Sequence, residues 1–492
     1  MKQLTGIDAN FLYMETPSSF GHVSSLVVYQ RPDPDFNPYT AFREQMESRL
    51  HLLEPFRRKL VEVPLSLDHP YWVNDPDFDL GFHVRHIAIP PPGDMVQLAE
   101  QVARIIGRPL DRSRPLWEAY VLEGLPDNDF AILTKVHHAT IDGSSGVEML
   151  TTILDSEPDG DEIPLDDGSW RAEPNPGALD LIGRAAINYV KTPGRAARIQ
   201  LRTMQQLAEA ARASGLASMI GAGRRQLPTV LGGSNDDESD QNGSGGGIRI
   251  SAPPTPFNKS ISPHRRLAMG SMPLAEIKAL KSGIGATVND VVMAISAGAL
   301  RNYLLTHDAL PEAPLRAMVP VSVRTGEEAD PWTNRVSGLV SNLPTNIEDP
   351  LERVMSVHQS MMAAKSQFDM LPADTLVDAA QLTLPAVAVQ ASRVAASLRL
   401  GDRGTAPVNV VISNVPGPRR PLYMAGAKMK RFYPVSTVAE GVGLNITVQS
   451  YLDTLDFGLV SCRELIPDLD YLLELHIAEV DVLFEASGIK RP

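Results

Sequence analysis

The segment with the clearest chemical character is residues 135–146, which read KVHHATIDGSSG. Two adjacent histidines, His137 and His138, are followed after three intervening residues by Asp142 and Gly143. A neutral imidazole is the usual side chain for taking a proton from a hydroxyl near neutral pH, because its pKa lies close to the working pH. The pattern therefore predicts general-base chemistry on a hydroxyl substrate.

Each part of this pattern also has a simpler interpretation. A single histidine at the end of a strand is more often structural than catalytic. Metal binding is not favoured, because adjacent strand residues face opposite sides and the sequence holds no HExxH pattern or Cys/His cluster. A Ser-His-Asp hydrolase would need a nucleophile elbow of the GxSxG type, which is absent from the sequence.

The elements around the histidines can hold them rigidly. The apolar run 131–136 is typical of a buried strand, which would deliver His137 and His138 at its end. Because successive strand residues point to opposite faces, the two histidines are expected to have different roles. Gly143 permits a turn closed to other residues, and the small residues after it can start a helix through Leu154.

The wider chain alternates strand-like and helix-like patterns, which indicates a mixed α/β fold. With 492 residues, of which 43% are hydrophobic and 21% charged, it has the balance of a globular protein and the length for two large domains. Before residue 155, strands are expected at 23–29, 119–122 and 131–136, and helices at 39–53 and 98–106.

A long connector separates the two halves. Residues 155–173 carry eight acidic side chains, and residues 184–226 carry eight basic ones. Apolar residues at helical spacing make the basic stretch amphipathic, which suits either an anionic lipid surface or a linker packed on its own protein. Residues 232–247 contain no apolar side chain and are expected to form a mobile loop. We therefore expect an N-terminal domain at 1–155, a linker at 156–260 and a C-terminal domain at 261–492.

Charge and cysteine content exclude some classes of protein. A net charge of −14 argues against a general nucleic-acid binder, which would show a strongly basic domain or face. The single cysteine, Cys462, excludes an intramolecular disulfide, fits a reducing compartment and is expected to be a buried core residue.

The sequence shows no feature of secretion or of membrane insertion. Asp8 and Glu15 interrupt the N-terminal segment, and the most apolar window, 382–400, is broken by proline and arginine. A cytoplasmic location is expected, with any contact to the membrane or to lipid inclusions being peripheral.

Three further motifs narrow the interpretation. RPLW lies at 114–117, TVNDVV at 287–292 and SNVPGP at 413–418, after the opening LTGIDANFLYMET. The HHxxxDG pattern resembles the signature of acyltransferases related to chloramphenicol acetyltransferase, peptide-synthetase condensation domains and plant alcohol acyltransferases. All the motifs together, in order over nearly the whole chain, resemble the bacterial wax ester synthase/diacylglycerol acyltransferase family in its actinobacterial branch.

This resemblance implies two chloramphenicol-acetyltransferase-like α/β sandwich domains, joined by a long, partly helical linker, with a substrate tunnel between them. It implies that His138 deprotonates the acceptor hydroxyl as it attacks the acyl-CoA thioester, without an acyl-enzyme, and then protonates the departing thiolate. Diacylglycerol is the expected acceptor and triacylglycerol the product. The alternatives are wax ester formation from long-chain alcohols, or a non-catalytic module of the same fold that binds lipid or a partner.

The resemblance also assigns supporting residues. Asp142 is expected to be structural and to pair with Arg324, and His137 is expected to be a structural neighbour or part of the tunnel wall. No cofactor or metal is implied, since acyl-CoA is a substrate. Because no phosphate-cradling glycine loop is present, scattered basic residues are expected to hold coenzyme A.

The other motif residues divide into structural and chemical candidates. Asp290 fits a capping box with Thr287, whereas the amide of Asn289 could orient the substrate or stabilise an oxyanion. Ser413 and Asn414 compete with Asn289 for that role.

In the RPLW motif, Trp117 is expected in the core or the tunnel wall. Arg114 fits either a salt bridge or a surface cation.

Overall fold

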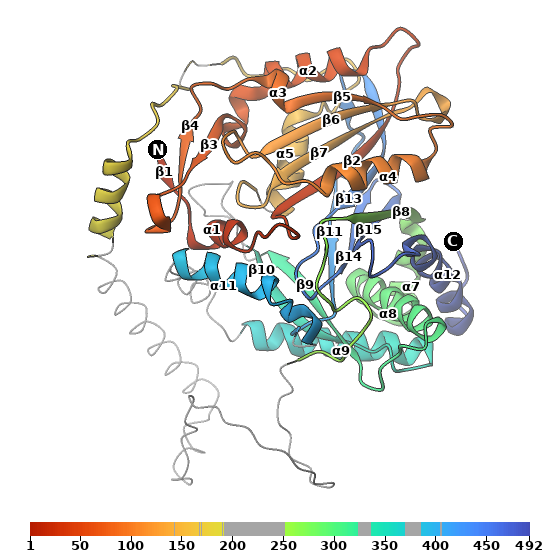
Figure 1. The fold of residues 1–492 in the computed structure, drawn as a ribbon. Coiled ribbons are helices and arrows are strands. Elements are labelled where there is room, and N and C mark those ends of the chain that lie inside the picture. The colour runs from red at the N-terminus through yellow and green to blue at the C-terminus, as the bar shows by residue number, and fades with distance from the viewer. Residues whose placement is uncertain are drawn as a thin grey trace, which may run out of the picture.

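A computed structural model describes residues 1–141, 143–166, 168, 170–188, 190, 251–322, 336–369, 385–403 and 406–492. The described part forms two six-stranded sheets, a small three-stranded sheet and the helices that pack on them (Figure 1). The small sheet has the order β1 (Lys2–Gln3), β4 (Tyr71–Asn74) and β3 (Arg58–Val61). This arrangement is the mixed α/β fold that the sequence predicts.

The first large sheet carries the strand that leads to the histidines. Its order is β12 (Tyr423–Met424), β13 (Ala427–Val435), β2 (His22–Gln30), β7 (Phe130–His137), β6 (Trp117–Glu123) and β5 (Val84–Ala88). Around β2, alternation sends Val27 to one core with α2 (Pro38–Arg49) and α5 (Gly143–Ile153), and Leu26 to another with α4 (Met95–Ile106). Helices therefore cover both faces of this sheet.

The second large sheet has helices packed in one layer. Its order is β10 (Val336–Leu343), β9 (Leu315–Ser322), β11 (Val410–Val415), β14 (Leu444–Tyr451), β15 (Thr454–Cys462) and β8 (Arg265–Pro273). The packed helices are α7 (Leu274–Ile284), α8 (Val288–Thr306), α9 (Pro350–Asp369) and α12 (Leu469–Ser487).

A helix cap and a buried ion pair stabilise this helical layer. Thr287 and Asp290 form the predicted capping box at the start of α8. Gly298 of α8 leaves room for the carboxylate of Glu479, which pairs with Arg353 of α9 in the buried interior. A β-carbon at Gly298 would lie 2.1 Å from the Glu479 carboxylate, so any larger residue would force this carboxylate to move.

Sheet membership does not follow the order of the chain. The sequence assigns residues 261–492 to a C-terminal domain, whereas β12 and β13 from this range belong to the first sheet. Strand β13 pairs antiparallel with β2 over residues 428–435, with a bulge after Met429. The second half of the chain therefore completes the sheet that carries the histidines.

The two large sheets meet where β13 contacts β15. A carboxylate oxygen of Asp456 in β15 accepts a hydrogen bond from the backbone amide of Phe432 in β13 at 2.9 Å. The other carboxylate oxygen accepts a bond from the hydroxyl of Ser271 at 2.6 Å. Gly458 approaches β13 so closely that an added β-carbon would lie 1.7 Å from the carbonyl oxygen of Pro434. Backbone contact, and not only side-chain packing, joins the sheets.

Most of the expected elements are present, with shifted ends. The strands expected at 23–29, 119–122 and 131–136 correspond to β2, β6 and β7, and the helix expected at 98–106 corresponds to α4. The helix expected at 39–53 ends earlier, at Arg49, and continues as 3-10 turns over Leu50–Leu52 and Glu54–Arg57. Cys462 is a buried free cysteine at the end of β15, as predicted.

The connector is partly described. Its first acidic residue, Asp155, is buried and pairs with Arg49, so the acidic segment begins inside the protein and not at its surface. The predicted mobile loop at 232–247 and the basic stretch after Val190 lie outside the described residues. Among the helices in the described ranges, none is by itself long and apolar enough to cross a membrane. Only α7 and α8 pass that test together, as a pair bent by 100°.

Candidate functional site

His138 directly follows β7, and two contacts orient it. Its backbone amide donates a hydrogen bond to the carbonyl of Gly21 at 2.7 Å. Its ring stacks on Phe11 of α1 (Gly6–Tyr13), with the ring centroids 4.2 Å apart and the planes 2° from parallel. The side chain of His138 remains half-buried, so the imidazole has a defined plane and is still partly exposed.

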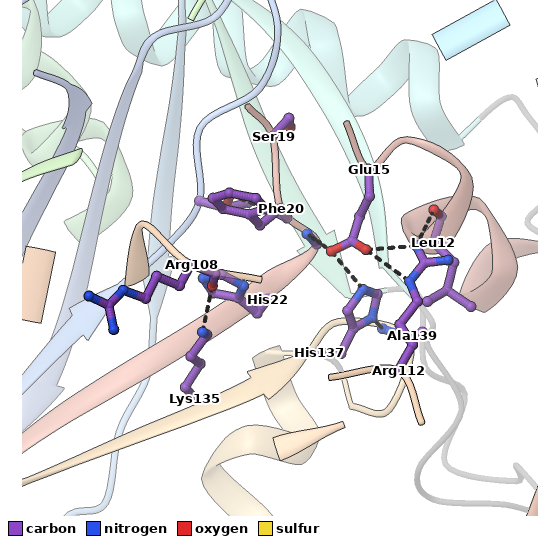
Figure 2. A network of polar contacts seen from close by, with 12 residues as sticks. Leu12, Glu15, Ser19, Phe20, His22, Arg108, Arg112, Lys135, His137 and Ala139 are labelled. Atoms are coloured by element: carbon purple, nitrogen blue, oxygen red, sulfur yellow. Dashed lines mark hydrogen bonds and ion pairs between the residues drawn. The ribbon is translucent and has the colours of Figure 1, made fainter. Parts of the chain in front are cut away.

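His137 makes different contacts and is only 1% exposed. Its Nδ1 accepts a hydrogen bond from the backbone amide of Ala139 at 3.0 Å, which assigns the ring proton to Nε2. That Nε2 lies 3.3 Å from Oε1 of Glu15 (Figure 2). The His137 ring therefore fixes the turn that carries His138, through its bond to the Ala139 amide.

Glu15 connects the contacts of both histidines. It accepts a hydrogen bond from the amide of Gly21 at 2.7 Å and another from Nη2 of Arg112 at 2.7 Å. Burial by itself would raise the pKa of Glu15, but the hydrogen bonds and charges of His137, Gly21 and Arg112 outweigh it and lower the pKa to about 2. Glu15 is thus an anion at any working pH. It holds Gly21, and the carbonyl of Gly21 accepts the hydrogen bond from the His138 amide.

Gly21 lies in a space that no larger residue fits. A β-carbon there would be 2.7 Å from Nε2 of His137 and 2.9 Å from the carbonyl oxygen of Phe11. The glycine therefore lets the backbone before β2 pass between the two elements that hold His137 and His138.

Lys135 and His22 bind backbone carbonyls at the end of α4 and just after it, and Figure 2 shows both side chains near Arg108. Nζ of Lys135 donates to the carbonyl of Arg108 at 2.6 Å, and Nε2 of His22 donates to that of Ile106 at 2.9 Å. Burial lowers the pKa of Lys135 to about 8. A cation near the last carbonyls of a helix is favourable. Lys135 also fixes Arg108, at the start of the segment that leads to Arg112.

The RPLW residues belong to the support of the sheet. Trp117 is 1% exposed, donates to the carbonyl of Phe56 at 2.9 Å and stacks on the buried His83, which makes it a core residue. The guanidinium of Arg114 lies 4.1 Å from the centroid of the Phe82 ring and 4.0 Å from a carboxylate oxygen of Asp111.

The second set of candidates lies on other elements. Asn289 is in the first turn of α8, within the helical layer of the second sheet. Ser413 and Asn414 lie inside β11, paired with Thr447 and Val448 of β14, so the SNVPGP motif begins within a strand. The oxyanion role of Asn289, Ser413 or Asn414 stays a prediction.

Two site residues expected from the sequence lie outside the described residues, namely Asp142 and Arg324. Gly143 begins α5, which confirms the helix expected after the motif. Sequence reasoning missed the roles of Phe11, Glu15 and Gly21. The opening motif contains the first two, but nothing local to them indicates a contact with residues more than 100 positions later.

The described residues provide neither a metal site nor a hollow next to β7. Within the described ranges, no group of three or more His, Cys, Asp and Glu side chains is arranged to hold a metal ion. A surface hollow of about 620 Å³ is lined by residues of α2 and its following turns, by residues of the segment 75–78, and by residues 163–166 and Trp170, and not by β7. The tunnel between the domains stays a prediction.

Comparison with known proteins gives matches over nearly the whole chain. The model described as "Wax ester synthase/diacylglycerol acyltransferase catalytic domain" matches residues 4–292, and that described as "WS/DGAT C-terminal domain" matches residues 332–482. A Mycobacterium tuberculosis protein named "Probable diacyglycerol O-acyltransferase tgs2" is 34% identical over 492 residues, covering 98% of each chain.

Solved structures give the same result. The wax ester synthase/diacylglycerol acyltransferase from Marinobacter aquaeolei VT8 aligns with a TM-score of 0.67 and 30% identity, over 99% of this chain and 100% of that one. The starter condensation domain of rhizomide synthetase aligns with a TM-score of 0.55 at 12% identity, over 100% of this chain and 96% of that one, which is a likeness of fold. The chain belongs to the wax ester synthase/diacylglycerol acyltransferase family.

Proposed function

We propose that this protein transfers a long-chain fatty acyl group from acyl-CoA to diacylglycerol and so makes triacylglycerol, with His138 as the general base. Family membership and the name of the mycobacterial relative support the reaction class and the acceptor. The observation that carries the catalytic assignment is the placement of His138. Its ring is set by Phe11, its backbone is held by Gly21, and the side chain is partly exposed.

In the proposed step, His138 takes the proton of the acceptor hydroxyl while its oxygen attacks the thioester carbonyl carbon. The tetrahedral oxyanion then collapses, the C–S bond breaks and the imidazolium returns the proton to the coenzyme A thiolate. No acyl-enzyme forms, and no cofactor takes part beyond the acyl-CoA substrate. A positioned general base contributes about 10²- to 10⁴-fold to the rate.

Asp142 and Arg324 are proposed as a structural pair that holds the loop after His138. Removal of one partner of a buried ion pair costs roughly 3–5 kcal/mol, because the other charge stays uncompensated. We expect Asp142→Ala to lose both thermal stability and activity, as measured by a melting curve and acyl transfer. A well-folded, fully active Asp142→Ala protein would rule out this assignment.

Labelled palmitoyl-CoA tests the reaction directly, with dioleoylglycerol and hexadecanol offered separately as acceptors. We expect labelled triacylglycerol from the purified protein and a fall of about 10²- to 10⁴-fold for His138→Ala. His264→Ala is the matched control, because His264 is an exposed histidine paired with Glu464. Product from hexadecanol alone would make the protein a wax ester synthase. No product with either acceptor, from folded protein, would reject the proposal.

The proposed location of the enzyme is the cytoplasm. There it would contact a membrane or a lipid inclusion peripherally, where a water-insoluble acceptor is available.

A further inference from the structure

Helix 178–188 presents apolar side chains on both of its faces. Leu181 and Ala185 are buried against Tyr71 of β4 and against Val63, which follows β3, and these contacts seat the helix on the protein. On the outward face, Leu179 is 85% exposed, Ile187 is 56% exposed and Val190, which is also helical, is 78% exposed; Ile182 is exposed as well. Figure 1 shows this helix beside β1 and β4, on the side of the molecule where α1 also lies.

The outward residues form a continuous stripe and are not scattered. Positions 179, 182, 183, 186, 187 and 190 are all exposed and non-polar. At about 100° per residue they span an arc of roughly 140°. The charged residues of the helix, Asp180 and Arg184, form an ion pair with each other at 2.9 Å and flank this arc. Single exposed aliphatic side chains are ordinary, but a contiguous stripe marks a contact surface.

The loop beside the helix adds two more exposed leucines. Leu65 is 84% exposed and Leu67 is 51% exposed, both close in sequence to the Val63 that packs under the helix. Leu65 also has a φ of +57°, in the left-handed region that a bulky residue seldom adopts. Folding gains little from an apolar side chain that is both strained and directed into water, so a partner outside the described fold would explain it.

This surface is connected to the histidine through one helix. Helix α11 (Pro385–Ser397) contacts the turn at 64–66 as well as α1. Ala388 and Val389 of α11 pack on the apolar cluster that includes Ala139, the residue after His138. A substrate entering at this side of the molecule would thus meet elements that contact the site.

We propose that this surface, formed by Leu65, Leu67, Leu179, Ile182, Ile187 and Val190 and called the apolar rim below, docks on a lipid surface. The proposal rests on the function proposed above, because diacylglycerol is dissolved in lipid and has to reach His138 from there. The chemistry of the rim favours lipid over a protein partner. All six side chains are aliphatic, whereas protein interfaces are enriched in aromatic residues and arginine. An aliphatic helix face with flanking charges can insert into the interface of a membrane without directional contacts.

Vesicle binding of the whole chain tests the rim. The variant Leu179→Gln/Ile187→Gln/Val190→Gln removes the apolar contacts and keeps good helix formers at exposed positions. Phosphatidylcholine vesicles containing dioleoylglycerol are the probe, and co-sedimentation is the readout. We expect binding to fall by about 10³-fold, since each of the three aliphatic side chains contributes on the order of tenfold even when only partly buried.

The matched control is Met355→Gln/Met362→Gln/Ile477→Gln. These residues are also exposed and apolar but lie on α9 and α12 of the second sheet. We expect this variant to bind vesicles like the natural protein. Equal binding by the rim variant would overturn the proposal, as would an equal loss of binding in the control variant. A rim variant that changes only the sedimentation coefficient would also overturn it, because the rim would then contact a second copy of the chain.

A fluorescent label gives a second measurement that needs no loss of function. Because the only cysteine, Cys462, is buried, Leu179→Cys can be labelled selectively with an environment-sensitive dye. We expect a blue shift on vesicle addition, with none for the same label at Ile477→Cys; a label at 179 that stays in a water-like environment would contradict docking. Neither binding readout requires turnover, so a protein that binds through the rim but makes no triacylglycerol would reject the proposed function alone.

Discussion

At the scale of single residues, the site is an imidazole held by a short relay of backbone and side-chain contacts. Arg112 holds Glu15, Glu15 holds the amide of Gly21, and the carbonyl of Gly21 receives the amide of His138. Such positioning matters because an error of about 1 Å in a reacting group can cost about 10²-fold in rate.

Gly21→Ala tests the close approach in this relay. The added methyl group would displace the ring of His137 or the backbone at Phe11, and with it the stacking partner of His138. We expect kcat to fall by about 10²-fold in the acyl-transfer assay. Gly177→Ala is the control, because no heavy atom lies within 4 Å of its β-carbon. A Gly21→Ala enzyme with the natural kcat would contradict this account.

Glu15→Gln tests the carboxylate at constant shape. Because an amide replaces an anion that accepts bonds from Gly21 and Arg112, we expect a loss of about 1–3 kcal/mol in the free energy of unfolding. We also expect kcat to fall more than KM changes, since the carboxylate does not act on substrate.

Glu62→Gln is the matched control for that variant. Glu62 also binds Arg112, at 2.8 Å, but its side chain is 58% exposed. Its loss should cost less than about 1 kcal/mol in urea unfolding. Equal effects of the two substitutions would show that Glu15 has no special connection to the histidines.

The sequence indicates His138 because adjacent histidines before Asp142 and Gly143 form a local pattern. It does not indicate Glu15 or Gly21, because their partners come from strands and loops far away along the chain. Contacts of this kind depend on which strands pair, which no short motif records.

At the scale of elements, α12 contains a histidine that folding keeps neutral. Nδ1 of His476 donates to the carbonyl of Leu472 at 2.7 Å, and its Nε2 is buried with no partner among the described residues. Burial lowers the pKa of His476 to about 4, against an opposing effect of the Leu472 carbonyl. The protonated ring is therefore disfavoured in the helix.

This burial predicts a pH dependence of stability. Between pH 6.5 and about 4 the unfolded chain binds the proton of His476 more strongly than the folded chain, so stability falls as the pH falls. We expect His476→Leu to reduce the loss of unfolding free energy between pH 7 and pH 5 by about 2 kcal/mol, measured by urea denaturation. Parallel curves for the natural protein and the variant would contradict the assigned pKa.

Elements are predictable from the sequence where their signal is local. Helix α4 follows from buried positions at helical spacing after the cap Asp94, and β7 follows from the short, mostly apolar run 130–136. The helix expected at 39–53 changes to a 3-10 turn after Arg49, although Leu50 and Leu53 continue the apolar helical spacing. Periodicity by itself does not mark such an end.

At the scale of the whole molecule, the junction of the two sheets depends on Gly458. We expect Gly458→Ala to lower the free energy of unfolding by about 1–3 kcal/mol, since the methyl group would overlap the Pro434 carbonyl and force β15 away from β13. Urea unfolding measures the change, with Gly177→Ala as the control. Unchanged stability would show that the sheets separate there at little cost.

The two-domain α/β architecture follows from length and alternating patterns. The placement of β13, from the second half of the chain, in the first sheet does not follow from them. Residues 427–435 are strand-like in sequence whichever sheet they join. Membership is decided by pairing with β2, a contact between the two ends of the chain.

The pairing of β2 with β13 also delays completion of the first sheet during synthesis on the ribosome. Strand β2 ends at Gln30 and its neighbour β13 begins at Ala427, which is 427 − 30 = 397 residues later. At about 5–20 residues per second, β2 is made roughly 20–80 s before its partner. During that interval the nascent sheet has an open edge that can pair with other chains. The first domain therefore cannot finish folding before most of the protein has been translated, and a chaperone that covers this edge would raise the yield.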